Sequence, residues 1–285
     1  MAVTLLEDLV HRIEHADNLD RVAKPIASKV GELVKPRPVR NFLSGTWLGH
    51  PLHPLLSDLP IGAWSMAALL DALDVEAADI LVGAGIVAAV PTAAAGANDW
   101  SDTYGEETRL GLVHAASNST ALVLQIASLL ARRRDERGLG KALSLAGVAA
   151  MFVGGYLGGH LTFVKAVDVN HTAWPTGPDS WTSVIAEADL ADGKPTKVDA
   201  GGVSVLLYRH GNTIQALANT CSHMGGPLDE GSVSHDGSGD CVTCPWHGST
   251  FRLNDGEVVR GPATIPQPRY ETRVTNGHIE VRVRP

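Results

Sequence analysis

The stretches TCSHMGGPLD (residues 220–229) and CVTCPWHGSTF (residues 241–251) decide how the C-terminal part of this 285-residue chain is interpreted. Each contains a cysteine closely followed by a histidine, with the spacings Cys221-x-His223 and Cys244-x2-His247. Two thiolates and two imidazoles, supplied in pairs by two loops, can bind zinc or an iron–sulfur cluster. The mixed pairing favours a [2Fe–2S] cluster in which one iron takes both thiolates and the other takes both imidazoles.

The sequence around these loops predicts a small antiparallel β domain. Short β-rich runs such as VSVLLYR (203–209) and HIEVRVR (278–284) are separated by GN, DG and NG turns. The segment DVNHTAWPTGPDS (168–180), which precedes them, has the Pro, Gly and polar content of a linker. A flexible segment of this length would reach about 20 Å.

Residues 181–285 resemble a Rieske domain through CSHMGGPL (221–228), CPWHGSTF (244–251) and DGEVVRGPA (255–263). The resemblance implies that Cys221 and Cys244 bind one iron and that His223 and His247 bind the other. Rieske oxygenases add a large mononuclear-iron domain after the cluster domain, and the 22 residues that follow Ala263 are too few for one. We therefore expect an electron carrier, and the sequence leaves open whether the protein is an enzyme.

The same resemblance addresses the tuning of the cluster. Rieske proteins of quinol-oxidising complexes carry an additional cysteine in each loop, joined as a disulfide, and Gly226 stands at the corresponding first-loop position. Ser249 stands where they place a hydroxyl that is hydrogen-bonded to a cluster sulfide, and Phe251 where they place a tyrosine. Keeping one such hydrogen bond and losing another implies an intermediate potential within about −150 to +300 mV. Cys241, the third cysteine, is expected not to be a ligand.

The N-terminal part has a membrane-like composition. Four apolar stretches lie at about 55–74, 78–98, 109–131 and 141–164, and each approaches the roughly 20 residues that cross ~30 Å of hydrocarbon. The first is the weakest, because Asp58 and Asp71 lie near its ends. Amphipathic helices are predicted at 4–15 and 19–34, and the prolines of KPRPVR (35–40) break the helical pattern.

The expected fold is an α-helical four-helix membrane bundle followed by an all-β antiparallel Rieske domain. Its expected boundaries are N-terminal amphipathic helices at 1–45, the bundle at 46–166, the linker at 167–180 and the Rieske domain at 181–285. Glycines at 83, 85, 154, 155, 158 and 159 suit close helix contact in lipid. A soluble Ala-rich bundle is the alternative.

Histidines of the helical part are candidates for a second redox site. The segment TWLGHPLHPLLSDLPIG (46–62) resembles an uncharacterised membrane domain of four predicted spans that is sometimes fused to a Rieske domain. Ionisable residues at membrane depth are costly and point to function. The candidates are His50, His53, Asp58, Asp99, His114 and His160. In an up-down bundle all of them except Asp58 are expected at one end, because they lie before the first span, at the end of the second, at the start of the third and at the end of the fourth. We expect His114 and His160 to bind haem b or quinone, with His50 and His53 flanking the site; the alternative is that each histidine only fixes a helix end.

Charge and topology limit the partners and the location. The net charge of −8 and a pI near 5.8 argue against nucleic acid, so the expected partners are a redox protein and the membrane. An even number of spans places both termini on one face of the cell membrane. The lack of an apolar N-terminal leader and cluster assembly in the cytoplasm favour the cytoplasmic face for the Rieske domain. Five basic residues lie near the spans on each face, so the positive-inside rule does not decide the orientation.

The leading functional hypothesis is a multi-pass membrane protein that passes single electrons between a soluble redox partner and a haem or quinone in the bundle. One alternative is a redox-sensing or binding protein in which the bundle is a simple anchor. Another is a ferredoxin component for a separate oxygenase. The sequence does not indicate an oligomeric state.

Overall fold

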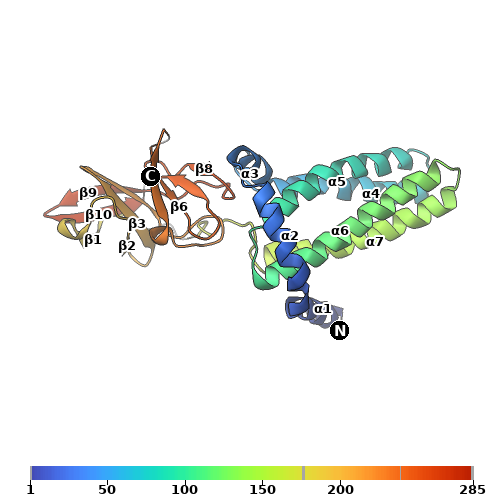
Figure 1. The fold of residues 1–285 in the computed structure, drawn as a ribbon, viewed down its shortest axis with the longest axis horizontal. Helices are drawn as coiled ribbons and strands as arrows, with labels where there is room; N and C mark the ends of the chain where they lie inside the picture. The colour runs from blue at the N-terminus through green and yellow to red at the C-terminus, as the bar shows by residue number, and fades with distance from the viewer. Residues whose placement is uncertain (1, 175–176, 238, 284–285) are drawn as a thin grey trace. The chain divides into compact units, whose positions relative to one another are not determined.

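Figure 1 shows a computed structural model of the chain, which describes residues 2–174, 177–237 and 239–283. The chain divides into two compact units. The helical unit consists of Met1–Pro36 and Pro51–Val167, and the β-rich unit consists of Arg37–His50 and Asp168–Pro285. This grouping differs from the sequence-based boundaries in that residues 37–50 and the described residues of 168–180 are grouped with the β-rich unit.

The described part of the helical unit contains two N-terminal helices and four long helices. They are α1 (Ala2–Glu14), the 3-10 turn η1 (Asp17–Leu19), α2 (Asp20–Leu33), α4 (Leu52–Ala72), α5 (Ala78–Trp100), α6 (Gly105–Arg132) and α7 (Arg137–Phe163). The long helices run side by side in Figure 1, and each covers one of the four expected apolar stretches. Within the described residues, α5, α6 and α7 are long and apolar enough to cross a membrane. The first stretch, α4, falls short of that standard, as its sequence indicated.

The outer surfaces of these helices remain apolar. Ile80 and Val87 of α5 are 72% and 73% exposed, and Val123 of α6 and Phe152 of α7 are also largely uncovered by the chain. Large exposed apolar side chains on long helices are typical of a face that meets lipid or a partner. With the length of the helices, it supports membrane association of this unit.

Between the helices, large side chains lie against glycines of the neighbouring helix. A Cβ at Gly85 would lie 2.2 Å from Nε1 of Trp64, whose indole N–H donates to the Val82 carbonyl at 3.3 Å. Glycine therefore makes room for a side chain that bonds to the backbone of the next helix. Six glycines were expected to serve such contacts. Gly85, Gly154 and Gly158 each have a close side-chain neighbour from another helix. Gly83 and Gly155 have no described atom within 4 Å, and Gly159 has only Phe163 within that distance.

A buried ion network joins α4, α5 and α6 where α4 and α6 end and α5 begins. The guanidinium of Arg132 at the end of α6 bonds to both carboxylate oxygens of Asp71 in α4, and its Nη1 lies 2.7 Å from Oδ1 of Asp79 in α5. The Arg132 side chain is only 1% exposed. Two carboxylates and one guanidinium thus tie three helices together, which explains why Asp71 is tolerated next to an apolar segment.

Residues 35–40 interrupt the helical pattern for a shorter stretch than expected. The helix α2 ends at Leu33 and α3 (Arg37–Ser44) begins within KPRPVR, so the helical pattern is interrupted over residues 34–36. Pro38 lies in the first turn of α3, where its missing N–H removes no helical hydrogen bond. Asn41 of α3 fixes the helix to the β-rich unit: its Oδ1 accepts the Gly261 N–H at 2.9 Å and its Nδ2 donates to the Val259 carbonyl at 3.3 Å.

The described strands of the β-rich unit form antiparallel sheets. The strands are β1 (Thr182–Ala186), β2 (Thr196–Asp199), β3 (Ser204–His210), β4 (Thr213–Ala218), β5 (Ser232–Asp236), β6 (Gly239–Thr243), β7 (Thr250–Arg252), β8 (Val258–Arg260), β9 (Tyr270–Thr275) and β10 (His278–Val283). Their orders are β1-β10-β9, β2-β3-β4 and β5-β6-β7-β8, and short 3-10 turns, η2 (Glu187–Asp189) and η3 (Leu228–Glu230), lie between strands. The expected NG turn joins β9 to β10, where Asn276 and Gly277 both have positive φ.

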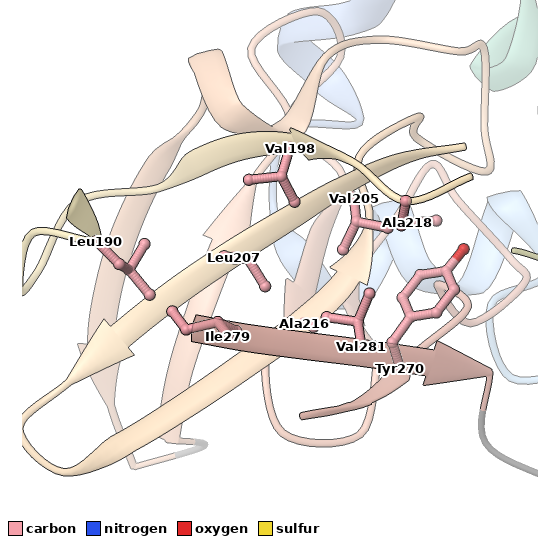
Figure 2. Packing of buried hydrophobic residues seen from close by; sticks show 10 residues of the cluster. Leu190, Val198, Val205, Leu207, Ala216, Ala218, Tyr270, Ile279 and Val281 are labelled. Atoms are coloured by element: carbon pink, nitrogen blue, oxygen red, sulfur yellow. The ribbon is translucent and has the colours of Figure 1, made fainter. Parts of the chain in front are cut away.

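Strand β3 separates two apolar cores. Because side chains alternate along a strand, Val205 and Leu207 enter the core shown in Figure 2, whereas Leu206 and Tyr208 enter a second core. All four of these side chains are at most 1% exposed. The first core lies between the two three-stranded sheets, and the second lies beneath the cysteine-containing loops.

Replacing Arg132 by alanine should destabilise the helical unit by about 3–5 kcal/mol, because it leaves two carboxylates without their shared cation. The neighbouring Arg133 is exposed, and Arg133→Ala should change stability by less than about 0.5 kcal/mol. Denaturant unfolding of the detergent-solubilised protein, followed by helical circular dichroism, compares the two variants. Equal effects would contradict the structural role of the network.

Candidate metal centre

The loop between β4 and η3 is closed by two backbone hydrogen bonds. The Cys221 N–H donates to the Gly226 carbonyl at 2.8 Å, and the Gly225 N–H donates to the Cys221 carbonyl at 2.9 Å. Gly225 has φ of +77°, a left-handed conformation that glycine adopts without strain. The tight loop leaves the His223 side chain close to that of Cys221.

The loop between β6 and β7 repeats this pattern. The Cys244 N–H donates to the Ser249 carbonyl at 2.8 Å, the Gly248 N–H donates to the Cys244 carbonyl at 3.1 Å, and Gly248 has φ of +74°. In both loops the glycine is the fourth residue after the cysteine. The two loops are therefore equivalent turns, and each presents one cysteine and one histidine.

The four side chains converge in the structure. Cys221 and Cys244 are 1% and 3% exposed, His223 is buried and His247 is half-buried. Donation from the Cys221 thiol to the Cys244 sulfur lowers the pKa of Cys244 to about 6, and the backbone N–H groups of Trp246 and His247 act in the same direction. The sulfur atoms thus lie together, in a setting that stabilises the thiolate of Cys244.

The imidazoles have a spacing that fits ligation of one metal. The ring centroids of His223 and His247 are 5.0 Å apart and their planes are inclined at 84°. Two imidazoles on one tetrahedral metal have centroids about 5 Å apart, because each metal–nitrogen bond is about 2.0–2.1 Å and each centroid lies about 1.1 Å further on. Two buried sulfurs and two suitably spaced rings fit the donor set of a cluster with mixed ligands.

Gly226 lies directly against the site. A Cβ at this position would be 2.8 Å from the Cys244 sulfur and 3.1 Å from Trp246, so no side chain fits there without displacement. Trp246 is 52% exposed and lies over this glycine. The three cysteines, all within the described residues, form no disulfide.

Asp168 is a neighbour of the site that the sequence analysis missed. Its Oδ1 lies 3.5 Å from Nε2 of His223, so Nδ1 is the nitrogen of that ring left to face a metal. Asp168 reaches this place because the following segment lies along the first loop: the His171 N–H donates to the Ser222 carbonyl at 3.1 Å. The segment expected as a linker therefore contributes to the β-rich unit. A carboxylate beside a ligating imidazole fixes the ring and makes it more electron-rich.

Gln267 supports the first loop through hydrogen bonds, and the sequence analysis did not identify it either. This residue is 2% exposed; its Oε1 accepts the Ser222 N–H at 3.0 Å and its Nε2 donates to the Ala218 carbonyl at 2.8 Å. The Ser222 hydroxyl donates to the Ile265 carbonyl at 2.9 Å. An isolated glutamine far along the chain carries no sequence signal for this role, because the contact depends on how the strands fold back.

Ser249 and Phe251 are fully buried next to the second loop. The Ser249 oxygen accepts the Ala263 N–H at 2.9 Å, which orients the hydroxyl and leaves its proton for donation. Phe251 packs in the second apolar core and offers no hydroxyl. Cys241 lies in β6, where its thiol is 3.7 Å from the Gly239 carbonyl.

The structure separates the candidate histidines of the helical part. His53 lies beside His114, with ring centroids 6.2 Å apart, whereas Nε2 of His160 lies 3.6 Å from Oε1 of Glu14 in α1. His50 is grouped with the β-rich unit. Of the other candidates, Asp58 is exposed, and Asp99 is buried and accepts from the Asn98 amide at 2.9 Å.

Comparison with known proteins identifies the class. Residues 180–271 match the family described as "Rieske [2Fe-2S] domain", and residues 49–171 match the family described as "Predicted membrane protein (DUF2231)". The chain is 32% identical over 102 residues to the Ferredoxin CarAc of Metapseudomonas resinovorans, a match that covers 35% of this chain and 92% of that protein. The chain therefore belongs to the Rieske [2Fe–2S] domain family and carries a predicted membrane domain.

Two further matches are an iron–sulfur subunit and a solved ferredoxin. The "Cytochrome b6-f complex iron-sulfur subunit" of Chlorobaculum tepidum is 29% identical over 79 residues, which are 28% of this chain and 40% of that one. The solved ferredoxin of carbazole 1,9a-dioxygenase from Nocardioides aromaticivorans IC177 is 28% identical, with a TM-score of 0.34, and the match covers 37% of this chain and 99% of that chain. The family matches confirm the expected fold class in its main division, a helical region with apolar candidate spans followed by an antiparallel Rieske domain.

Ser249→Ala should lower the reduction potential of the cluster. The buried hydroxyl can donate to the site, and such a bond stabilises the more negative, reduced state. A hydrogen bond worth about 0.5–1.5 kcal/mol corresponds to about 20–60 mV for one electron. Redox titration followed by electron paramagnetic resonance measures the shift, and an unchanged potential would mean that Ser249 serves only the turn.

Asp168→Asn should raise the reduction potential of the cluster, which is the opposite of the effect expected for Ser249→Ala. The carboxylate beside His223 opposes the electron that reduction adds, and the amide keeps the shape without the charge. The expected shift is on the order of tens of millivolts, because Asp168 is partly screened by solvent. The exposed Asp189→Asn is a matched control that should leave the potential unchanged. A fall in potential for Asp168→Asn would contradict the assigned role.

Proposed function

We propose that this protein is a membrane-anchored Rieske iron–sulfur electron carrier that passes single electrons between a soluble redox protein and a haem or quinone in its helical unit. The observation that carries the proposal is the convergence of two buried cysteines and two imidazoles on equivalent loops of a Rieske fold. The predicted membrane domain in the same chain supports the anchoring.

In this proposal Cys221 and Cys244 bind one iron of a [2Fe–2S] cluster, and His223 and His247 bind the other. The cluster supplies reversible one-electron transfer. The chain contributes the setting: burial of the sulfurs limits contact with water, and backbone N–H groups donate toward Cys244. Ring fixation by Asp168 adds to the same role. No bound substrate needs to be transformed for this function.

Membrane insertion follows from the outer surfaces of the long helices. Their large exposed apolar side chains would be costly in water and favourable in lipid. We propose a multi-pass arrangement in the cell membrane with the Rieske domain on the cytoplasmic face. Cluster assembly in the cytoplasm supports this face. In this arrangement all four long helices cross the membrane, with α4 as the fourth span beside the three candidate spans α5, α6 and α7, and the even number returns the chain to the side from which it entered.

A ferredoxin role for a separate oxygenase is the second candidate. The identity to the Ferredoxin CarAc over almost its whole length favours it. In that case the soluble partner would be an oxygenase that accepts electrons, and the helical unit would hold the carrier at the membrane. Both candidates require the same cluster and differ in which protein receives its electrons.

Cys221→Ser and His247→Ala should each abolish the cluster, whereas Cys241→Ser should retain it, since Cys241 lies in β6 away from the loop pair. The full-length protein is reduced in membranes, and the rhombic resonance of a cluster with mixed thiolate and imidazole ligands is measured in each variant. Iron and acid-labile sulfide are counted in parallel, so that loss of the cluster is separated from loss of the protein.

Loss of the resonance in Cys241→Ser, with normal protein content, would show that the ligand set is wrong. Electron transfer is tested on the unmodified membranes by adding quinols or a reduced soluble ferredoxin reductase. If neither reduces the cluster and no oxidant in the membrane reoxidises it, the carrier role should be rejected.

A further inference from the structure

Two imidazoles of the helical unit form a pair that the sequence did not predict. His53 lies in the first turn of α4 and His114 lies in α6, and their ring planes are inclined at 83°. The pair expected from sequence, His114 and His160, is not what the helices bring together, because His160 turns toward Glu14 and α1. The long helices therefore bring together His53 and His114 rather than His114 and His160.

Both rings are held by the same kind of bond. Nδ1 of His53 lies 3.0 Å from the Thr92 carbonyl of α5, and Nδ1 of His114 lies 2.8 Å from the Gly154 carbonyl of α7. A carbonyl oxygen can only accept, so Nδ1 carries the proton in each ring. In the neutral imidazole the lone pair is then on Nε2. Donation of the remote N–H to a backbone carbonyl is the usual way in which a metal-binding histidine is oriented.

Each ring also occupies a place that a glycine provides. A Cβ at Gly96 of α5 would lie 2.7 Å from Cε1 of His53, and a Cβ at Gly158 of α7 would lie 3.0 Å from Cε1 of His114. The helices α5 and α7 thus accommodate the rings closely as well as accepting their protons. Both side chains are half-buried and fixed from two directions.

The spacing of the pair differs from that of the cluster histidines. Two imidazoles on opposite sides of one metal have centroids about 6.3 Å apart, from two metal–nitrogen bonds of about 2.0–2.1 Å and two ring radii of about 1.1 Å. The observed separation of 6.2 Å corresponds to this opposed arrangement, whereas the 5.0 Å of His223 and His247 corresponds to a tetrahedral angle.

Asn118 lies next to the pair, with its amide nitrogen within hydrogen-bond distance of both ring nitrogens of His114. Its Nδ2 is 3.4 Å from Nδ1 and 3.3 Å from Nε2 of that ring, and it donates to the His114 carbonyl at 3.1 Å. The amide therefore limits the movement of the ring.

We propose that His53 and His114 bind one transition metal through their Nε2 atoms, from opposite sides. Imidazole nitrogen suits iron, copper, nickel and zinc, and haem iron takes axial imidazoles. The shared chemistry is axial coordination by two neutral imidazoles, and the metal can come as a free ion or within a porphyrin. The inference rests on the proposed function only for the role of the site as the second redox centre; metal binding stands on the geometry alone.

The test uses the full-length protein, purified in detergent with its cluster. Haem is measured by the pyridine haemochrome spectrum and other metals by elemental analysis, both relative to the Rieske resonance. His53→Asn and His114→Asn keep an amide N–H where Nδ1 donates but remove the second nitrogen. Each should lower haem or metal content at least tenfold while the Rieske resonance is retained. His160→Asn is the matched control and should keep both.

A second pair of variants tests how the His53 ring packs against α5. Gly96→Ala should displace the His53 ring and lower the bound metal, whereas Gly83→Ala on the same helix meets no described atom within 4 Å and should not. Haem in the unmodified protein would identify a porphyrin, and a stoichiometric metal without haem would identify a free ion.

The proposal is overturned by either of two results. One is an unmodified protein that holds no haem and no metal beyond the cluster, even after incubation with hemin, Cu²⁺ or Zn²⁺, including the case in which it holds only quinone. The other is retention of the metal in His53→Asn and His114→Asn. A missing Rieske resonance in the unmodified protein would instead reject the proposed function, so the two failures are distinguishable.

Discussion

Close approach of a side chain to a neighbouring backbone, made possible by a glycine at the point of contact, is the constraint on which both units depend. In the helical unit Gly85 receives Trp64, and Gly96 receives His53. In the β-rich unit Gly226 leaves space beside the Cys244 sulfur. At each position a methyl group would lie closer than van der Waals contact to the facing side chain. At each of these positions the polar or reactive side chain and the glycine that faces it therefore depend on each other.

The two cysteine-containing loops could be predicted from sequence because their candidate ligands and turn glycines are local: a cysteine, a histidine and a glycine lie within five residues in each loop. The apolar stretches were equally readable, since length and composition define a candidate span. Asp168 could not be assigned, because its contact with His223 depends on the course of the segment after α7. The exchange of His160 for His53 has a similar cause: helix rotation is set by packing at glycines, which an apolar pattern does not encode.

The two histidine pairs illustrate how one side chain serves two kinds of setting. In the β-rich unit Nε2 of His223 faces a carboxylate, so the ring gains electron density from an anion. In the helical unit the rings face backbone carbonyls, which fix the tautomer without adding charge to an apolar layer. The choice of partner follows the surroundings: a carboxylate is tolerated near solvent, whereas between apolar helices an uncharged acceptor avoids the cost of a buried ion.

The position of β3 between two cores separates the packing of the β-rich unit into a part with and a part without the two cysteines. The core containing Val205 and Leu207 includes neither ligand cysteine, whereas Cys221 and Cys244 belong to the core that contains Leu206 and Tyr208. The packing of the first core therefore uses no side chain that would bind the cluster, whereas the packing of the second core does. We expect the loss of iron to disturb the second core before the first.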